Sequence, residues 1–259
     1  MSFALPLSTV HVLGVTLHAI TAAQLLSGIE STMVENRRAI VANVNVNAMN
    51  LAWEQPGFRA FLNRSDIVFC DGFGVKWGAR LLGQRVPERI TYADWMWQLA
   101  EFAEPRGFTF FFLGARPGVA ASAAGRLRER FPALQIVGVQ HGYFDPTPGS
   151  SENESVVRAV NAVRPNILVL GFGMPRQERW LMENWSRIEA NVALTGGAVF
   201  DYVSGETRRG PRWMTDHGLE WLARLLIEPR RLWKRYLVGN PLFLWRVIQQ
   251  RMGLVRFQE

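Results

Sequence analysis

The sequence contains a single cysteine, Cys70, among its 259 residues. One cysteine cannot form an intramolecular disulfide, so a disulfide-stabilised fold is excluded and a reducing compartment is favoured. Cys70 ends an apolar segment, which indicates a small buried residue rather than a catalytic thiol. The four histidines are scattered, and no Asp-x-Asp or paired-histidine motif occurs, so the sequence predicts no metal site.

Long hydrophobic runs are also missing. No uncharged apolar stretch reaches about 18 residues, so no transmembrane helix is expected. The N-terminal segment MSFALPLSTVHVLGV has no positively charged start and no clear cleavage site, and we do not interpret it as a signal peptide. We therefore expect a cytoplasmic protein, or one that lies peripherally on the inner face of the cytoplasmic membrane.

Basic residues are concentrated at the C-terminal end. The formal net charge is +7, and residues 206–259 hold 11 of the 29 Lys and Arg residues but only 5 of the 22 Asp and Glu residues. Residues 1–205 are therefore almost neutral. A basic tail of this kind is typical of contact with phosphate, in lipid headgroups, in a diphosphate ligand or in nucleic acid. We call residues 206–259 the C-terminal appendage and predict a domain boundary near residue 205.

Short apolar segments alternate with longer segments of helical periodicity. Strands are predicted at 40–46, 67–70, 109–113, 135–140, 167–170 and 191–195, with a weaker one at 10–17. Helices are predicted at 21–37, 50–62, 75–82, 92–104, 118–130, 152–163 and 175–184. This alternation indicates an α/β, Rossmann-like fold with a parallel sheet and helices on both faces. In the appendage, Pro229, Gly239 and Pro241 predict a series of short helices.

Polar or glycine-rich motifs fall at the carboxyl ends of four of the predicted strands, and a fifth motif opens a helix. The motifs are Asn43-Val44-Asn45, Asp71-Gly72-Phe73-Gly74, the stretch 171–178, Thr195-Gly196-Gly197, and the stretch 114–118. Ligands of such folds bind beyond the carboxyl ends of the strands. The candidate substrate-binding residues of the glycine motifs are Gly114, Arg116, Gly171, Gly173, Gly196 and Gly197, because glycines before helix N-termini suit phosphate. The spacing of Gly72, Gly74 and Gly78 is not that of a dinucleotide fingerprint, so no nicotinamide cofactor is expected.

Periodicity alone leaves the roles of the polar residues open. Asp71 is either a turn or helix-capping residue or a general base. Asn45 is either a hydrogen-bond bridge or a ligand contact, and Arg89 either pairs with a nearby carboxylate or binds substrate. Gln177 and Glu178 would most simply lie on the solvent face of a helix. Their joint placement at one sheet edge favours a functional site.

Longer stretches of the chain carry a family resemblance. They are SDIVFCDGFG (65–74), RLLGQRVPER (80–89), FFLGARPGV (111–119), IVGVQHGYF (136–144), ILVLGFGMPRQERW (167–180), TGGAVFDYVSGE (195–206) and GLEWLARLLIEPRRLWKRY (218–236). Over nearly the whole chain, from about residue 10 to 245, the sequence resembles the WecG/TagA/CpsF glycosyltransferases, glycosyltransferase family 26. The resemblance implies a Rossmann-like core with a helical appendage.

The resemblance also implies an activity. It implies an inverting enzyme, working without a bound metal, that moves a hexose or N-acetylhexosamine from a UDP-sugar to a polyprenyl-diphosphate-linked sugar in polysaccharide or exopolysaccharide synthesis. The general base would be Asp71, with Asn45, Arg89 and Gln177 in the catalytic group. The appendage arginines that the resemblance assigns to substrate are Arg209, Arg224, Arg231 and Arg235. The implied partners are these two substrates and the inner membrane surface, and since family members often self-associate, a homo-oligomer as well.

The chain departs from the usual family pattern at the candidate substrate-binding residue Asn43 and in the two residues before another candidate, Asp94. Asn43 stands where threonine is usual, and Asp94 closes Thr91-Tyr92-Ala93-Asp94 where the family often has T-G-S-D. Both changes bear on sugar recognition. Two other functions remain open: a non-catalytic, membrane-associated protein that binds a nucleotide sugar, and a nucleic-acid-binding protein. The neutral body and the helical spacing of the appendage aromatics argue against nucleic acid.

Overall fold

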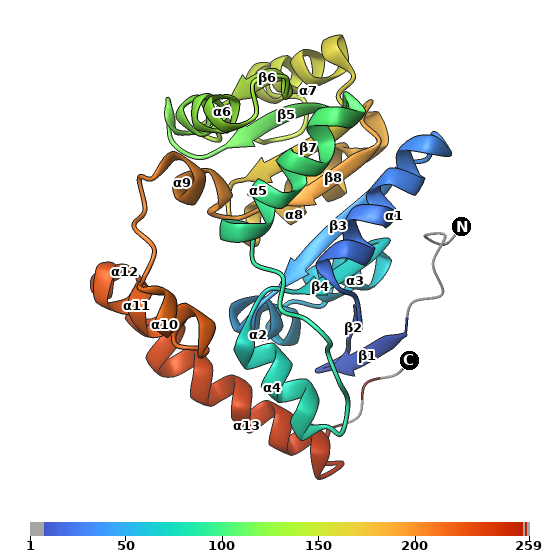
Figure 1. Ribbon diagram of the computed structural model, residues 1–259. Coiled ribbons are helices and arrows are strands. Elements are labelled where there is room, and N and C mark those ends of the chain that lie inside the picture. Colours follow the sequence, from blue (N-terminus) through green and yellow to red (C-terminus); the bar gives the residue numbers. More distant parts are fainter. Residues whose placement is uncertain (1–7, 256, 258–259) are drawn as a thin grey trace.

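The computed structural model describes residues 8–255 and residue 257. Six parallel strands form its central sheet in the order β4-β3-β8-β7-β5-β6 (Figure 1). The strands are β3 (Ala39–Val44), β4 (Ile67–Cys70), β5 (Thr109–Gly114), β6 (Gln135–Gln140), β7 (Ile167–Gly171) and β8 (Val192–Thr195). All six coincide with predicted strands to within two residues, which confirms the α/β, Rossmann-like fold.

Helices cover both faces of the sheet (Figure 1). One face carries α1 (Ala22–Val34), α5 (Tyr92–Ala103), α6 (Val119–Arg130) and α9 (Val199–Ser204). The other carries α2 (Val46–Glu54), α3 (Pro56–Arg64), α4 (Phe73–Leu81), α7 (Ser151–Val163) and α8 (Arg176–Asn184). Two short 3₁₀ helices, η1 (Glu104–Arg106) and η2 (Trp185–Arg187), complete this part of the chain. The sequence patterns did not indicate α9.

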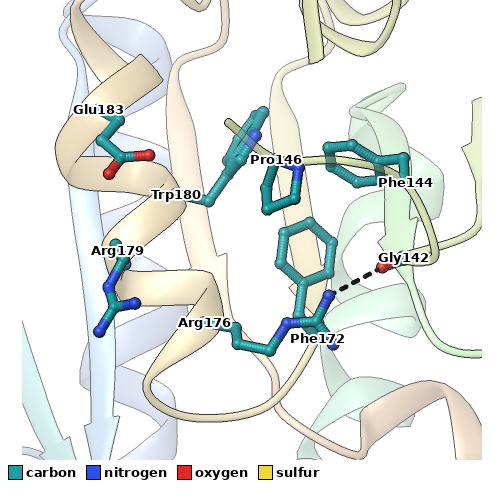
Figure 2. Close-up of a pocket in the computed structure, with 8 residues that line it drawn as sticks. All are labelled: Gly142, Phe144, Pro146, Phe172, Arg176, Arg179, Trp180 and Glu183. Carbon is teal, nitrogen blue, oxygen red and sulfur yellow. Dashed lines mark hydrogen bonds between the residues drawn. The ribbon is translucent and has the colours of Figure 1, made fainter. Parts of the chain in front are cut away.

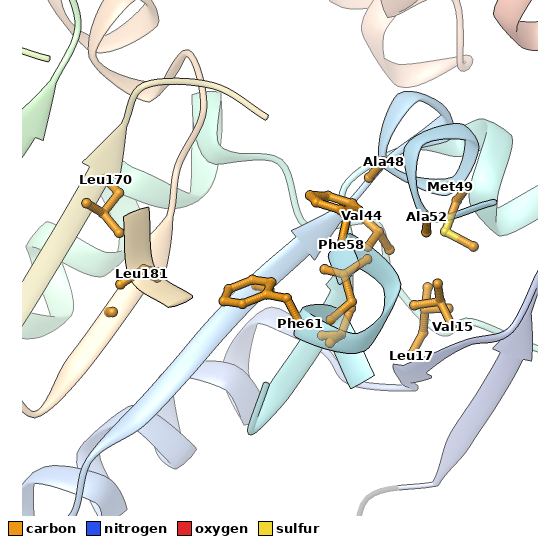
Figure 3. Close-up of a cluster of buried hydrophobic side chains, with 14 of the residues drawn as sticks. Val15, Leu17, Val44, Ala48, Met49, Ala52, Phe58, Phe61, Leu170 and Leu181 are labelled. Atoms are coloured by element: carbon orange, nitrogen blue, oxygen red, sulfur yellow. The ribbon is translucent and has the colours of Figure 1, made fainter. Parts of the chain in front are cut away.

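The core consists of two apolar clusters separated by the sheet. Successive residues of a strand point to opposite faces, so Val41 joins one cluster and Ala42 the other. Figure 3 shows part of one cluster, in which Val44 of β3 meets Phe58 and Phe61 of α3. Strands β4, β7 and β8 are buried along their whole length, which explains why their sequences are almost continuously apolar rather than alternating. The edge strand β6 differs, because Gln135, Val137 and Val139 are exposed.

The N-terminal strand prediction is wrong in one respect. The single strand expected at 10–17 is an antiparallel hairpin of β1 (Thr9–Val12) and β2 (Val15–His18), which forms a separate two-stranded sheet. Leu13 and Gly14 at the turn have φ values of 50° and 75°. Two consecutive positive φ angles are what a tight two-residue hairpin turn requires.

The helix predicted at 50–62 is also wrong, because two helices occupy this region. The first, α2, starts earlier, since the Asn45 side chain caps it by accepting from Asn47 N and Ala48 N. The second, α3, begins at Pro56, which lacks the N–H that a continuing helix would need.

The appendage contains α10 (Arg212–Asp216), α11 (Glu220–Ile227), α12 (Pro229–Trp233), a π-helical turn at Lys234–Val238, and α13 (Gly239–Arg251). Pro229 begins a helix as predicted, but Gly239 and Pro241 do not end one. The π turn joins α12 to α13, and Pro241 lies in the first turn of α13, where its missing N–H is tolerated.

Helix α13 packs against α2 and α4 of the core (Figure 1). Phe243 and Val247 are buried there, and Asn50 Nδ2 donates to Gly239 O at 2.8 Å. Arg246 contacts Glu54 at 2.9 Å. That the appendage is a separate domain starting near residue 205 remains a prediction. Among residues 8–255 and 257, no helix has the length and apolarity to cross a membrane.

Candidate active site

The carboxyl ends of β3, β4 and β8 bring three predicted polar positions into one hydrogen-bonded chain. Thr195 Oγ1 donates to Asn43 Oδ1 at 3.1 Å, and Asn43 Nδ2 donates to Asp71 Oδ2 at 2.8 Å. Thr195 and Asn43 are buried, whereas Asp71 is partly exposed. Parallel strands end at the same sheet edge, and neighbouring β3 and β4 in register place Asn43 beside the start of the Asp71 loop. These hydrogen bonds hold one Asp71 oxygen in place at the edge of the sheet.

The surroundings of Asp71 raise its pKa from 3.8 to about 7. Burial is the largest cause, and the negative charge of Glu220 acts in the same direction. The positive charge of Arg89 and the hydrogen bonds from Thr91 and Asn43 oppose the shift. A carboxyl group with a pKa near 7 is a better proton acceptor than an ordinary aspartate and is still ionised in part at neutral pH.

Asn45 contacts the appendage as well as capping a helix. Its Oδ1 accepts from Asn47 N and Ala48 N at the start of α2, and also from Arg235 Nη2 at 3.4 Å. Burial lowers the pKa of Arg235, and the charge of Asp71 partly restores it. An appendage guanidinium group therefore lies beside the polar residues at the end of β3.

Arg89 joins the core to the appendage by an ion pair. Its Nη1 donates to Glu220 Oε2 at 2.6 Å, and the guanidinium group lies 4.7 Å from the centre of the Phe73 ring. Both charged side chains are mostly buried, with 13% and 17% exposed. Such a pair is desolvated and positions both groups more firmly than a surface ion pair would.

A second ion pair across the same boundary involves the predicted residues Asp94 and Arg209. Arg209 Nη1 and Nη2 contact the two Asp94 oxygens, the second at 2.7 Å, in the bidentate arrangement that suits guanidinium and carboxylate. Arg209 Nη2 also lies 3.9 Å from Glu220 Oε2. Glu220 thus lies between two arginines, one from each part of the chain.

Arg224 of the appendage packs against an aromatic side chain of α9. Its guanidinium group is 5.2 Å from the centre of the Tyr202 ring, and Trp221 packs on Tyr236 with ring centres 6.0 Å apart. The pKa of Arg224 is raised, because the nearby phenol and carboxyl groups outweigh the opposing effect of burial. Arg224 therefore remains a cation within a largely buried aromatic environment.

Gln177 is completely buried and joins two glycine loops. Its Oε1 accepts from Gly173 N at 3.2 Å and from Gly197 N at 3.1 Å, and its Nε2 donates to Glu178 Oε1 at 2.8 Å. The interpretation that Gln177 and Glu178 lie on a solvent face is wrong, because Glu178 is only 1% exposed. Both side chains point from the first turn of α8 toward the sheet edge rather than away from it.

Comparison with known proteins identifies the family. The profile of the glycosyl transferase WecG/TagA/CpsF family matches residues 10–256. The chain belongs to this family. It is therefore a glycosyltransferase, as the sequence resemblance indicated.

Two relatives illustrate the match. An N-acetylglucosaminyldiphosphoundecaprenol N-acetyl-beta-D-mannosaminyltransferase of Staphylococcus aureus (strain NCTC 8325 / PS 47) is 25% identical over 244 residues, which is 93% of each chain. An enzyme of the same name from Bacillus spizizenii (strain ATCC 23059 / NRRL B-14472 / W23) is 29% identical over 213 residues, covering 82% of this chain and 80% of its own.

Two of the predicted glycine positions, Gly114 and Gly171, lie in close packing contacts. A Cβ atom on Gly114 would lie 2.5 Å from the backbone of Gly171, and one on Gly171 would lie 2.5 Å from the Phe200 ring. The backbone N–H groups of Gly173, Gly196 and Gly197 all donate to protein acceptors. These amides are thus engaged within the protein, and direct phosphate contacts by them remain a prediction.

Two predicted arginines lie apart from Asp71 and its neighbours. Arg116 is exposed and pairs with Glu206 at 3.2 Å, and Arg231 is exposed and pairs with Glu228 at 2.6 Å. Their positive charges both lower the pKa of Asp201, although burial raises it overall. The structure therefore groups Arg116 and Arg231 around the start of α9, and their predicted substrate contacts are untested.

A separate cavity of about 150 Å³ lies between α8 and the loop that follows β6 (Figure 2). Its lining residues are Gly142, Phe144, Pro146, Phe172, Arg176, Arg179, Trp180 and Glu183. Arg176 Nη2 closes one end by donating to Gly142 O at 3.4 Å. None of these residues is among those that contact Asp71, so we assign the cavity no part in the transfer reaction.

The sequence indicated the character of Cys70 correctly but gave no indication of the role of Glu220. Cys70 is buried and burial raises its pKa to about 12, which agrees with the prediction of an unreactive thiol. Glu220 was not predicted, although it contacts Arg89 and influences Asp71. The only available signal was a carboxylate inside a strongly basic segment.

Within residues 8–255 and 257, no group of three or more His, Cys, Asp or Glu side chains could hold a metal ion.

Proposed function

We propose that this glycosyltransferase moves a hexose or N-acetylhexosamine from a UDP-sugar to a polyprenyl-diphosphate-linked sugar, with inversion, in the synthesis of a cell-surface polysaccharide or exopolysaccharide. Family membership supports the transfer reaction. The names of both relatives give N-acetylmannosamine as the sugar they transfer and a diphosphoundecaprenol-linked N-acetylglucosamine as their acceptor. UDP-N-acetylmannosamine is therefore the first donor to test.

In this proposal, Asp71 acts as the general base. The acceptor hydroxyl forms a bond to the anomeric carbon as its proton passes to the Asp71 carboxylate, and the bond from the anomeric carbon to the UDP oxygen breaks. The observation that carries this assignment is an aspartate at the sheet edge, partly exposed as a residue and held on one oxygen by Asn43, whose carboxyl pKa is raised to about 7. General base catalysis of this kind contributes about 10²- to 10⁴-fold to the rate.

The leaving UDP carries the charge that must be stabilised, and we assign this role to guanidinium groups without a metal ion. Arg235 lies beside Asn45, and Arg89 and Arg209 lie on either side of Glu220. Arginine stays protonated and its planar fork matches two phosphate oxygens. A diphosphate entering here would compete with Glu220 for Arg89.

A transfer assay tests the proposal. Purified protein is incubated with UDP-sugars and a short-chain polyprenyl-diphosphate N-acetylglucosamine acceptor, in the presence of EDTA. We expect one UDP-sugar to give a disaccharide-linked product in EDTA, and Asp71→Ala to lower its rate by at least about 100-fold while UDP binding survives. Equal rates for the wild type and Asp71→Ala would remove Asp71 from this role, and a strict requirement for added divalent metal would remove the guanidinium assignment.

We further propose that the appendage contacts the inner membrane surface, where a polyprenyl acceptor resides. Trp233, Leu237 and Trp245 have 45–56% of their surfaces exposed, and Trp77 and Leu81 of the adjoining helix α4 are exposed as well. Exposed aromatic and apolar side chains on a basic helical segment suit an anionic lipid interface.

Vesicle flotation tests the membrane contact. The triple variant Trp233→Ser/Leu237→Ser/Trp245→Ser should float less with vesicles containing phosphatidylglycerol than the wild type does. The matched control replaces Val34 and Val163, which are exposed on α1 and α7, by serine and should float normally. Equal flotation of the wild type and the triple variant would contradict docking through these residues.

A further inference from the structure

The loops that follow β7 and β8 are joined by one side chain. Gln177 Oε1 accepts from Gly173 N in the first loop and from Gly197 N in the second, at 3.2 and 3.1 Å. Gly197 lies two residues after Thr195, which holds Asn43 and through it Asp71. The amide of Gln177 is therefore the start of a continuous path of bonds that ends at the proposed base.

Gln177 can accept both hydrogen bonds in only one orientation of its side-chain amide. Both glycine groups are N–H donors, so they require the carbonyl end of Gln177. The reversed amide would place its NH₂ group against two donors and lose both hydrogen bonds. Glu178 provides the acceptor that selects the working orientation, because Gln177 Nε2 donates to Glu178 Oε1 at 2.8 Å. The two side chains are 0% and 1% exposed, so bulk water does not replace either partner.

We infer that Glu178 is a positioning residue for the glycosyl transfer. It fixes the Gln177 amide, which clamps the loops after β7 and β8 and thereby holds Thr195, Asn43 and the Asp71 carboxyl group in place. The inference rests on the transfer reaction proposed above. Glu178 itself touches no reacting atom.

The role requires an acceptor oxygen at position 178 rather than a negative charge. Burial raises the pKa of Glu178 to about 7, and among the residues that the structure describes its Oε2 has no hydrogen-bond partner. The neutral acid, protonated on Oε2, keeps Oε1 as an acceptor for Gln177. A glutamine at this position would offer the same carbonyl oxygen, whereas methionine would fill the space without an acceptor.

The first experiment compares Glu178→Gln and Glu178→Met with the wild type. We expect Glu178→Met to lower kcat by about 10- to 100-fold with a smaller change in KM, because misplacement of a catalytic group by a fraction of an ångström affects the chemical step most. Glu178→Gln should recover kcat to within about threefold of the wild type. The control Glu183→Met, an exposed position on the same helix, should match the wild type.

A double-mutant cycle with Gln177→Ala tests the route of the effect. If Glu178 acts through Gln177, Glu178→Met should cause no further loss in the Gln177→Ala background. Independent, additive losses would overturn the inference. So would wild-type kcat in Glu178→Met, or an equal defect in Glu178→Gln, since the latter would show that the charge is required.

Hydrogen–deuterium exchange separates this inference from the proposed function. The amides of Gly173 and Gly197 should exchange faster in Glu178→Met than in the wild type and Glu178→Gln, whatever the activity. Unchanged exchange would refute the clamp. A wild type that transfers no sugar, with the exchange result as expected, would refute the proposed function instead. If Glu178→Met and Glu178→Leu both fail to fold while Glu178→Gln folds, Glu178 is a stability residue and the inference is wrong.

Discussion

The raised pKa of Asp71 predicts that replacing it by asparagine stabilises the protein while abolishing transfer. The folded-state pKa is about 7, against an ordinary value of 3.8. A carboxyl group whose pKa is raised by folding binds its proton more tightly in the folded state. Folding therefore loses stability as the pH rises from about 4 to 7, and the loss is complete above pH 7. Asparagine cannot ionise, so Asp71→Asn escapes this loss.

The size of the effect follows from the shift. A difference of about 3 units at about 1.4 kcal/mol per unit gives an upper limit of about 4 kcal/mol. Because Asp71 lies at the edge of the sheet and is partly exposed as a residue, solvent and relaxation around the charge reduce this value, and we expect about 2 kcal/mol. Asparagine keeps an oxygen that can accept from Asn43, so the bond to that residue need not be lost.

Urea unfolding of the wild type and Asp71→Asn at several pH values measures this difference. The two proteins should have nearly equal free energies of unfolding at pH 4, and Asp71→Asn should be more stable by about 2 kcal/mol at pH 8. Asp145→Asn is a control of opposite sign, because hydrogen bonds from Thr147 lower the pKa of the exposed Asp145 and its loss should not stabilise. A stability difference for Asp71→Asn that does not vary with pH would refute the reasoning.

Three further predictions concern Glu220, Thr195 and Gly171. Glu220→Gln should move the acidic limb of the kcat/KM profile to lower pH, because the Glu220 charge raises the pKa of Asp71; an unchanged or upward-shifted limb would contradict this. Thr195→Val removes the hydroxyl that donates to Asn43 Oδ1 and accepts from Asn43 N, and it should lower kcat by at least about fivefold, the value for a single hydrogen bond of about 1 kcal/mol; steady-state kinetics equal to the wild type would speak against the chain of bonds. Gly171→Ala should destabilise the fold by about 1–3 kcal/mol through overpacking against a phenylalanine ring, and wild-type urea unfolding would show that the ring can move away.

Much of the fold was predictable because buried parallel strands have a simple sequence pattern. The six strands of the central sheet are short, largely apolar and separated by helical segments, and each was predicted within two residues. The errors lie where local chemistry outweighs periodicity. The turn at Leu13 and Gly14 divides one apolar segment into a hairpin, and the π turn at Lys234–Val238 carries a helix past Gly239.

The site was predictable in part for a related reason. Asp71 directly follows β4 and Asn43 lies one residue before the end of β3, and the parallel sheet brings these strand ends to one edge. Glu220 was out of reach, because its role depends on how the appendage packs against Arg89, more than 100 residues away in sequence. Glu178 was misjudged because helical periodicity does not show that the first turn of α8 is directed into the sheet edge.

The pH dependence of single-turnover transfer, measured in EDTA for the wild type and Asp71→Asn, tests the central claim most directly. The account predicts that the wild-type rate rises with pH through an apparent pKa near 7, and that the residual rate of Asp71→Asn is at least about 100-fold lower and flat over the same range. An Asp71→Asn rate close to that of the wild type, or one that keeps the same acidic limb, would contradict it.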